Sequence, residues 1–104
     1  MNLEIVLYTD HKQGKLVAFQ NDKKVGYLTY AMKNCSIVNI TDLTLIKGYE
    51  QQNIEKELID SIAELARNNR KQIIAESKFA KLILEMDKSY QDVLNPKEIN
   101  QVLA

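Results

Sequence analysis

The chain has 104 residues, of which 45% are apolar and 27% are charged, so it has enough apolar residues for a core and we expect one domain over residues 1–104. Fourteen basic residues balance fourteen acidic ones, which argues against nucleic acid or an anionic membrane surface as a partner. No apolar run is long enough to span a membrane and no signal peptide is evident, so we expect a cytoplasmic protein. With one Cys and one His, we expect neither an internal disulfide nor a metal site.

The first part of the chain predicts four strands, of which the first three are antiparallel. Residues 3–10 alternate in hydropathy, and residues 15–20 form a second short strand after a polar turn. The pair Asn21–Asp22 tolerates the positive φ of a tight hairpin, which leads into a third strand at residues 25–33. β-Branched residues dominate residues 37–46, and this predicts a fourth strand of a length that suits the centre of a sheet.

A helix is predicted next, because the apolar residues begin to recur at intervals of three and four. These residues are Ile54, Leu58, Ile62 and Leu65. Asn53 suits the N-cap, and the helix should end near Asn68 or Asn69. Residues 72–76 then predict a short strand, which would lie parallel to the fourth strand in a β-α-β unit.

The remaining residues predict two short helical segments. Ser77 should cap a helix at residues 78–86, with its larger apolar side chains on one side: Phe79, Leu82, Ile83 and Met86. A last turn of helix is expected to begin at Pro96, with Asn95 as its cap.

This order of elements, together with the residues from Ile40 to Leu94, resembles the GNAT acyltransferases, and in particular the small single-domain GNAT-like proteins of bacteria and their eukaryotic relatives. The most specific pieces are KFAK at residues 78–81 and SYQDVL at residues 89–94, with a weaker echo in VGYLTY at residues 25–30. The resemblance implies an α+β fold, of the α/β-type three-layer acyl-CoA N-acyltransferase kind. It further implies a mixed, mostly antiparallel sheet and a short C-terminal helix.

The resemblance also implies a reaction, the transfer of an acetyl group from acetyl-CoA to an unidentified amine. In this family the cofactor lies where the fourth and fifth strands separate, its pantetheine arm pairs with the fourth strand, and its pyrophosphate meets the N-terminus of the next helix. Carried over position by position, the resemblance places the cofactor against Leu43, Thr44, Leu45, Gln51, Gln52, Asn53, Ile54 and Lys81.

The loop before the helix departs from the family's pattern Q/R-x-x-G-x-G/A. Its first position is Glu50, and Asn53 and Glu55 stand where the two small residues are expected. A Cβ keeps the backbone away from phosphate oxygens, and carboxylates repel a polyanion. We interpret the loop as a degenerate P-loop, which leaves open whether acetyl-CoA or coenzyme A binds.

Two residues are catalytic candidates. Asp42 is the only carboxylate within the fourth strand and is the candidate general base. Ser77 stands where the family has a Cys, although the chain has no second His that would activate its hydroxyl. Tyr49 and Tyr90 are further candidate proton donors.

Three interpretations of function remain open. The chain is an N-acetyltransferase with a remodelled loop, or a catalytically inactive GNAT-fold binding or interaction module that has lost coenzyme A binding, or a protein that binds a less anionic ligand in the same opening. The partner is accordingly an unknown amine acceptor or a protein, with no nucleic acid and no membrane. We expect a monomer or a weak homodimer.

Overall fold

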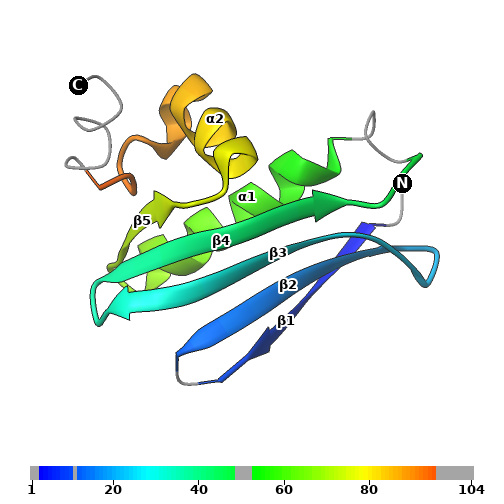
Figure 1. Cartoon of the computed structure of the whole chain (residues 1–104), viewed down its shortest axis with the longest axis horizontal. Helices are drawn as coiled ribbons and strands as arrows, with labels where there is room; N and C mark the ends of the chain where they lie inside the picture. The colour runs from blue at the N-terminus through cyan, green and yellow to red at the C-terminus, as the bar shows by residue number, and fades with distance from the viewer. Residues whose placement is uncertain (1–2, 11, 49–52, 96–104) are drawn as a thin grey trace.

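The computed structural model describes residues 3–10, 12–48 and 53–95. The elements are β1 (Leu3–Thr9), β2 (Gln13–Gln20), β3 (Lys23–Asn34), β4 (Ile37–Leu45), α1 (Ile54–Asn68), β5 (Gln72–Ala75), α2 (Lys78–Met86) and a 3-10 turn, η1 (Lys88–Tyr90). The strands lie in chain order in one sheet, antiparallel except for the parallel pair β4 and β5 (Figure 1). The α+β class and the mixed sheet are confirmed, while the helix expected from Pro96 lies outside the described residues.

The first three strands are joined by short turns. Asn21 and Asp22 have φ values of 52° and 66°, so the β2–β3 hairpin has the positive-φ turn that its sequence predicts. Between β1 and β2, a carboxylate oxygen of Asp10 accepts hydrogen bonds from the backbone N–H groups of Lys12 and Gln13, at 2.9 and 3.0 Å. Side-chain capping of this kind closes a turn without further secondary structure.

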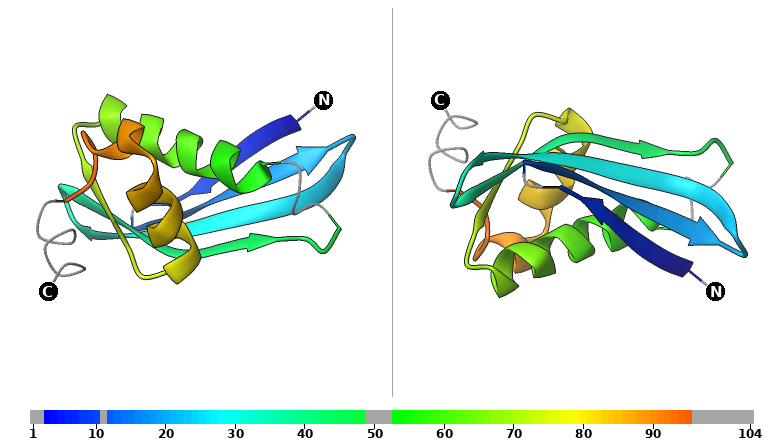
Figure 2. Two further views of the ribbon diagram at one scale, coloured as in Figure 1. Left: turned by 90° about the horizontal axis from the view of Figure 1, so that it is seen from above. Right: turned by 90° about the horizontal axis from the view of Figure 1, so that it is seen from below.

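Helix α1 covers one face of the sheet (Figure 2). Its buried side chains recur at helical spacing: Ile54, Leu58, Ile59, Ile62, Ala63 and Ala66. They belong to one apolar cluster with buried strand residues such as Leu28 and Val38. The core therefore lies between α1 and this face of the sheet.

Helix α2 lies beside α1 rather than on the opposite face (Figure 2). Residue Ile73 of β5 pairs in parallel with β4 on one side and with Leu94 on the other. The connections β4–α1–β5 and β5–α2–Leu94 both step in the same direction along the sheet. When two such connections have the same hand, their helices lie on the same face of the sheet. The two described α-helices therefore lie on the same face of the sheet.

The orientation of α2 differs from the expected one. The side chains that α2 buries are Ala80 and Leu84, whereas Phe79, Leu82 and Met86 are 42%, 56% and 76% exposed. The larger apolar residues thus form the outer side of the helix, and only Ile83 among them packs partly against the core. Periodicity identified the helix but not its inner face, because a short helix with apolar residues on two sides has no unique amphipathic orientation.

A β-bulge interrupts β4. The consecutive residues Thr29 and Tyr30 of β3 pair with Asp42 and Ile40 of β4, so Thr41 is an extra residue without a cross-strand partner. The buried residues of β4 are Val38 and Ile40 before Thr41 and Leu43 after it, so their numbering changes from even to odd. The bulge therefore changes which residues of β4 face the core.

Candidate functional site

Strands β4 and β5 separate after a short parallel ladder. Their last pair is Ile40 with Ala75, and the backbone N–H groups of Glu76 and Ser77 then donate to the carbonyl of Ile40 at 2.9 and 3.3 Å. β4 continues to Leu45, while the chain after β5 turns away into α2. Beyond Ile40, no strand of the described residues pairs with β4 on this side.

Backbone groups of β4 point into this opening. The N–H of Ile46 donates to the carbonyl of Val25 at 2.9 Å, so Ile46 faces β3. Because backbone groups alternate between the two edges of a strand, Thr44 also faces β3, whereas Leu43 and Leu45 face the opening. Of the three β4 residues that the resemblance places against a cofactor, two thus present backbone donors and acceptors there.

The N-terminus of α1 has an unusual first residue. Asn53 adopts a left-handed conformation with a φ of 57°, as its residue type allows, and its side chain makes no capping hydrogen bond. Its carbonyl accepts from the N–H of Glu57 at 3.2 Å. The apolar side chain of Ile54 is fully buried in the core, so a ligand at this end of α1 would meet the backbone of Ile54 and not its side chain. The backbone N–H groups of a first helical turn have no partner within the helix and can donate to such a ligand. Gln51 and Gln52 lie outside the described residues.

Glu55 turns inward in the first turn of α1. It precedes the fully buried Ile59 and Ile62 by four and seven residues, so its side chain starts on the same side of the helix. Its Oε2 atom is buried, and no described residue gives it a hydrogen bond. Together with Glu57, it makes the first turn acidic where an anionic ligand would need positive potential.

Asp42 lies on the uncovered face of the sheet. Its Oδ2 accepts a hydrogen bond from the hydroxyl of Thr44 at 3.2 Å, and its register partner is Thr29 of β3. The hydroxyls of Thr29 and Thr41 are 2.8 Å apart on the same face. Asp42 is therefore half-buried among hydroxyl groups and next to the opening between β4 and β5.

Ser77 caps α2, as its sequence predicts. Its Oγ accepts from the backbone N–H of Ala80 at 3.2 Å, and its carbonyl accepts from the backbone N–H of Lys81 at 2.9 Å. The hydroxyl proton of Ser77 is not used in that cap and is available to a further acceptor. Because Ser77 and Glu76 both bind the carbonyl of Ile40, Ser77 and Asp42 lie on either side of the point where β4 and β5 separate. The structure records no hydrogen bond between their side chains.

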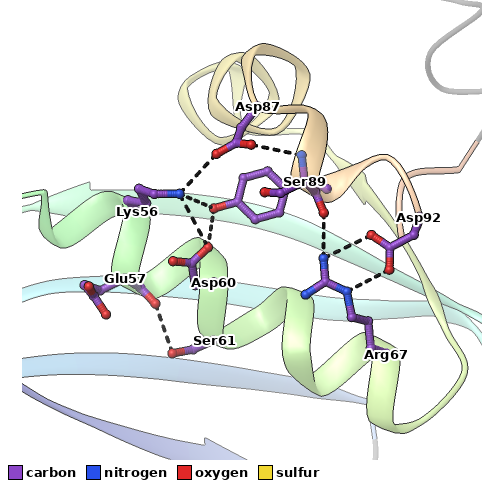
Figure 3. A network of polar contacts seen from close by, with 9 residues as sticks. Lys56, Glu57, Asp60, Ser61, Arg67, Asp87, Ser89 and Asp92 are labelled. Carbon is purple, nitrogen blue, oxygen red and sulfur yellow. Dashed lines mark hydrogen bonds and ion pairs between the residues drawn. The ribbon is translucent and has the colours of Figure 1, made fainter.

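Tyr90 contacts the side of α1 that carries Lys56 and Asp60. Figure 3 shows Lys56 and Asp60 on α1 facing Asp87 of the segment after α2. Its ring is buried, and its hydroxyl donates to Asp60 and accepts from Lys56 Nζ at 3.4 Å. Burial and the hydrogen bond to Asp60 raise the pKa of Tyr90 to about 12. Lys56 also reaches Asp87 at 3.1 Å, so the cluster fastens η1 to α1 and holds the Tyr90 hydroxyl in hydrogen bonds with α1. Tyr49, the other candidate donor, lies outside the described residues.

The uncovered sheet face also carries two lysines that no motif indicates. The ammonium groups of Lys15 and Lys24 lie 4.5 and 4.9 Å from the centre of the Tyr27 ring. Lys15 also lines a hollow of about 580 Å³ with Tyr8, Thr9, Asp10, Gln13, Gly14, Thr29, Tyr30, Ala31 and Thr41. The alternation of β2 places Lys15 on its polar side, but only the folded sheet brings the two lysines together.

Other kinds of site find no support among the described residues. They contain no group of three His, Cys, Asp or Glu side chains that would hold a metal ion. Cys35 is exposed in the turn between β3 and β4. In the same ranges, neither α-helix combines the length and the hydropathy that crossing a bilayer requires.

Comparison with known proteins gives a clear result at the level of structure. No family model and no curated protein sequence matches the chain. A solved structure of a GCN5-like protein from Staphylococcus aureus has 27% sequence identity and a TM-score of 0.67, over 86% of this chain and 87% of that one. The chain is a GNAT-like protein.

More distant structures share the fold of this GNAT-like protein. A GNAT family acetyltransferase from Elizabethkingia anophelis with acetyl-CoA bound has a TM-score of 0.67 at 13% identity, over 82% of this chain and 73% of that one. An aminoglycoside acetyltransferase from a soil metagenomic sample, in complex with sisomicin, has a TM-score of 0.61 at 21% identity. This second alignment covers 79% of the present chain and 59% of the other.

Proposed function

We propose that this GNAT-like protein transfers an acetyl group from acetyl-CoA to an amine, with the pantetheine arm in the opening between β4 and β5. The observation that carries the proposal is the separation of β4 from β5 after Ile40, with a bulge at Thr41. Bulges are frequent next to active sites because they redirect backbone groups. The backbone groups of Leu43 and Leu45 then offer a strand edge to which an amide-containing arm can add.

Residues beside this opening suit an amine-to-thioester transfer. Bound acetyl-CoA supplies a thioester whose carbonyl carbon the amine nitrogen attacks as the carbon–sulfur bond breaks. Asp42 takes the proton that the attacking amine loses. The hydroxyl of Ser77 donates a hydrogen bond towards the departing sulfur, a role that needs no activating base. Ser77 thus acts as a donor and not as a nucleophile.

The diphosphate of acetyl-CoA fits the N-terminus of α1 less well than the pantetheine arm fits β4. The left-handed Asn53 supports an anion site at the N-terminus of α1, because it opens the first turn as a glycine would. Glu55 opposes such a site, since its carboxylate brings like charge to a diphosphate. This is the observation that favours the second interpretation, a GNAT-fold module without coenzyme A binding.

A titration followed by backbone amide NMR distinguishes the two interpretations. We expect acetyl-CoA to shift the amide signals of Leu43, Leu45 and Ile54 and to saturate. Acetyl-pantetheine, which lacks the diphosphate and the nucleotide, is the matched ligand that tests β4 alone. Absence of shifts with both ligands at millimolar concentration would contradict the proposal and support the binding module. If both ligands cause shifts and bind with equal affinity, the pantetheine arm binds along β4 and the diphosphate of acetyl-CoA gains nothing from the N-terminus of α1.

A further inference from the structure

The ammonium groups of Lys15 and Lys24 form a pair of positive charges over the Tyr27 ring. No described carboxylate lies within ion-pair distance of Lys15 or Lys24. Repulsion by Lys15, followed by partial desolvation, lowers the pKa of Lys24. An anion placed between the two ammonium groups would remove this repulsion, so the pair has the electrostatics of an anion site.

The position of the pair relates it to the candidate base. Lys15 of β2, Thr29 of β3 and Asp42 of β4 occupy one row of the sheet, because each pairs with the next in register. Neighbouring strands lie about 4.8 Å apart, so the two ends of this row are about 10 Å apart at the backbone. The side chains of Lys15, Thr29 and Asp42 rise from the same uncovered face.

The hollow lined by Lys15, Thr29 and Thr41 borders this row on the side of the β1–β2 turn, and neither Asp42 nor Lys24 belongs to its lining. Its volume of about 580 Å³ is within the range of small-molecule sites. Its lining includes the cation of Lys15 and the carboxylate of Asp10, an exposed aromatic ring in Tyr8, and the hydroxyl groups of Thr29 and Thr41. A small molecule that lies along the row would meet positive charge at one end and Asp42 at the other.

We infer that the acceptor is a small amine that also carries an anionic group, with the anion held by Lys15 and Lys24 and the amine at Asp42. The inference rests on the proposed acetyl transfer and specifies its acceptor class. A carboxylate several bonds from a primary amine satisfies both ends of the row. Amino carboxylates are therefore the expected class, and amines without an anion are poor acceptors.

A binding experiment tests the anion site without turnover. The probes are 6-aminohexanoate and 6-aminohexan-1-ol, which have the same chain length and differ in the carboxylate. We expect 6-aminohexanoate to shift the amide signals of Lys15 and Tyr27, and the alcohol to leave them unchanged. Lys15→Met keeps the apolar stem and should abolish the response, whereas Lys33→Met, at the far end of β3, should preserve it. Equal responses to both probes, or a response that survives Lys15→Met, would overturn the inference.

A turnover experiment separates the inference from the proposed function. With acetyl-CoA, we expect the KM for 6-aminohexanoate to be about tenfold lower than for the alcohol, and Lys15→Met to remove that difference with little change in kcat. Added salt should raise the KM of the carboxylate alone. Turnover without discrimination would refute the acceptor class and leave acetyl transfer intact. Carboxylate-dependent binding without any turnover would support the anion site and refute acetyl transfer.

Discussion

Arg67 of α1 and Asp92 form a two-pronged ion pair, with Nε donating to Oδ2 at 2.7 Å and Nη2 donating to Oδ1 at 3.0 Å (Figure 3). The same Nη2 atom also donates to the carbonyl of Ser89 at 2.7 Å. Ser89 and Asp92 belong to the SYQDVL stretch that carries much of the resemblance. In this chain the stretch therefore fastens the segment after α2 to α1.

Arg67→Lys should lower the melting temperature slightly. Lysine keeps the charge but cannot reproduce the two parallel hydrogen bonds of a guanidinium group. The measurement is thermal unfolding at low and high salt, and the difference from the parent protein should shrink at high salt because both side chains are partly exposed. Arg70→Lys is the control, since the described residues give the Arg70 side chain no ion-pair partner. An equal effect of both variants would show that the paired geometry contributes nothing.

Tyr90→Phe should destabilise the fold by about 1.5–3 kcal/mol, because it removes a buried hydroxyl that hydrogen-bonds charged groups. The raised pKa of Tyr90, about 12, has a second consequence. The stabilisation that it reflects is complete below the ordinary tyrosine value of about 10 and is lost as the pH rises towards 12. Urea unfolding at neutral and alkaline pH measures both effects. Tyr8→Phe, at an exposed ring, should have neither.

Asp87 should contribute to the acid sensitivity of the fold. Hydrogen bonds from Ser89, first from its backbone N–H, and then from Lys56 lower the pKa of Asp87 to about 2. A lowered pKa gives stabilisation that is present above the ordinary value of about 4 and is lost as the pH falls towards 2. Asp87→Asn should therefore flatten the stability profile between these two values. Asp22→Asn, in the β2–β3 hairpin, should leave the profile unchanged, and an unchanged profile for both variants would contradict the assignment.

The orientation of α2 gives a sharp comparison of two leucines. Leu84→Ala should cost about 2–5 kcal/mol because it leaves a cavity in the core. Leu82→Ala, two residues earlier on the exposed side, should change stability by no more than about 0.5 kcal/mol. Chemical denaturation of both variants provides the measurement. A larger effect at Leu82 would mean that a partner covers this side of α2 in solution.

Asp42→Asn tests the candidate base. If Asp42 takes the proton of the acceptor amine, kcat should fall by about 10²- to 10⁴-fold, while acetyl-CoA affinity stays near that of the parent. Steady-state kinetics and the NMR titration are measured on the same preparation. Thr44→Val is the companion variant, since it removes the hydroxyl that donates to Asp42 and leaves the carboxylate in place. Full activity of Asp42→Asn would exclude Asp42 as the base.

Local signals in the sequence predicted most of the fold. The Asn21–Asp22 turn, the start of α1 after Asn53 and the cap at Ser77 depend on residues close together in the chain, and the structure confirms their positions. The parallel pairing of β5 followed from the helix that precedes it. Such features depend on backbone preferences and capping, which residue type alone largely decides.

The features that the sequence did not reveal depend on residues far apart in the chain. The inner side of α2 is chosen by its packing against α1 and β5, not by its own hydropathy pattern. Lys15 and Lys24 meet only because of the way β2 and β3 pair, with a register shift between Ala18 and Phe19. The extra residue at Thr41 shows in the sequence only as two consecutive polar residues, Thr41 and Asp42, between Ile40 and Leu43, and strand propensity alone does not identify this as a bulge. Much of the candidate site thus depends on register, which short-range patterns do not determine.

The bulge at Thr41 adds one residue to a strand whose side chains alternate between the two faces of the sheet. Before Thr41 the even-numbered side chains of β4 face the core, and after it the odd-numbered side chains do. If β4 paired without this bulge, the alternation set by Val38 and Ile40 would direct the carboxylate of Asp42 into the apolar core and Leu43 into solvent. The chemistry available on the open face therefore depends on a local irregularity of the backbone at Thr41, a residue that need not take part in that chemistry.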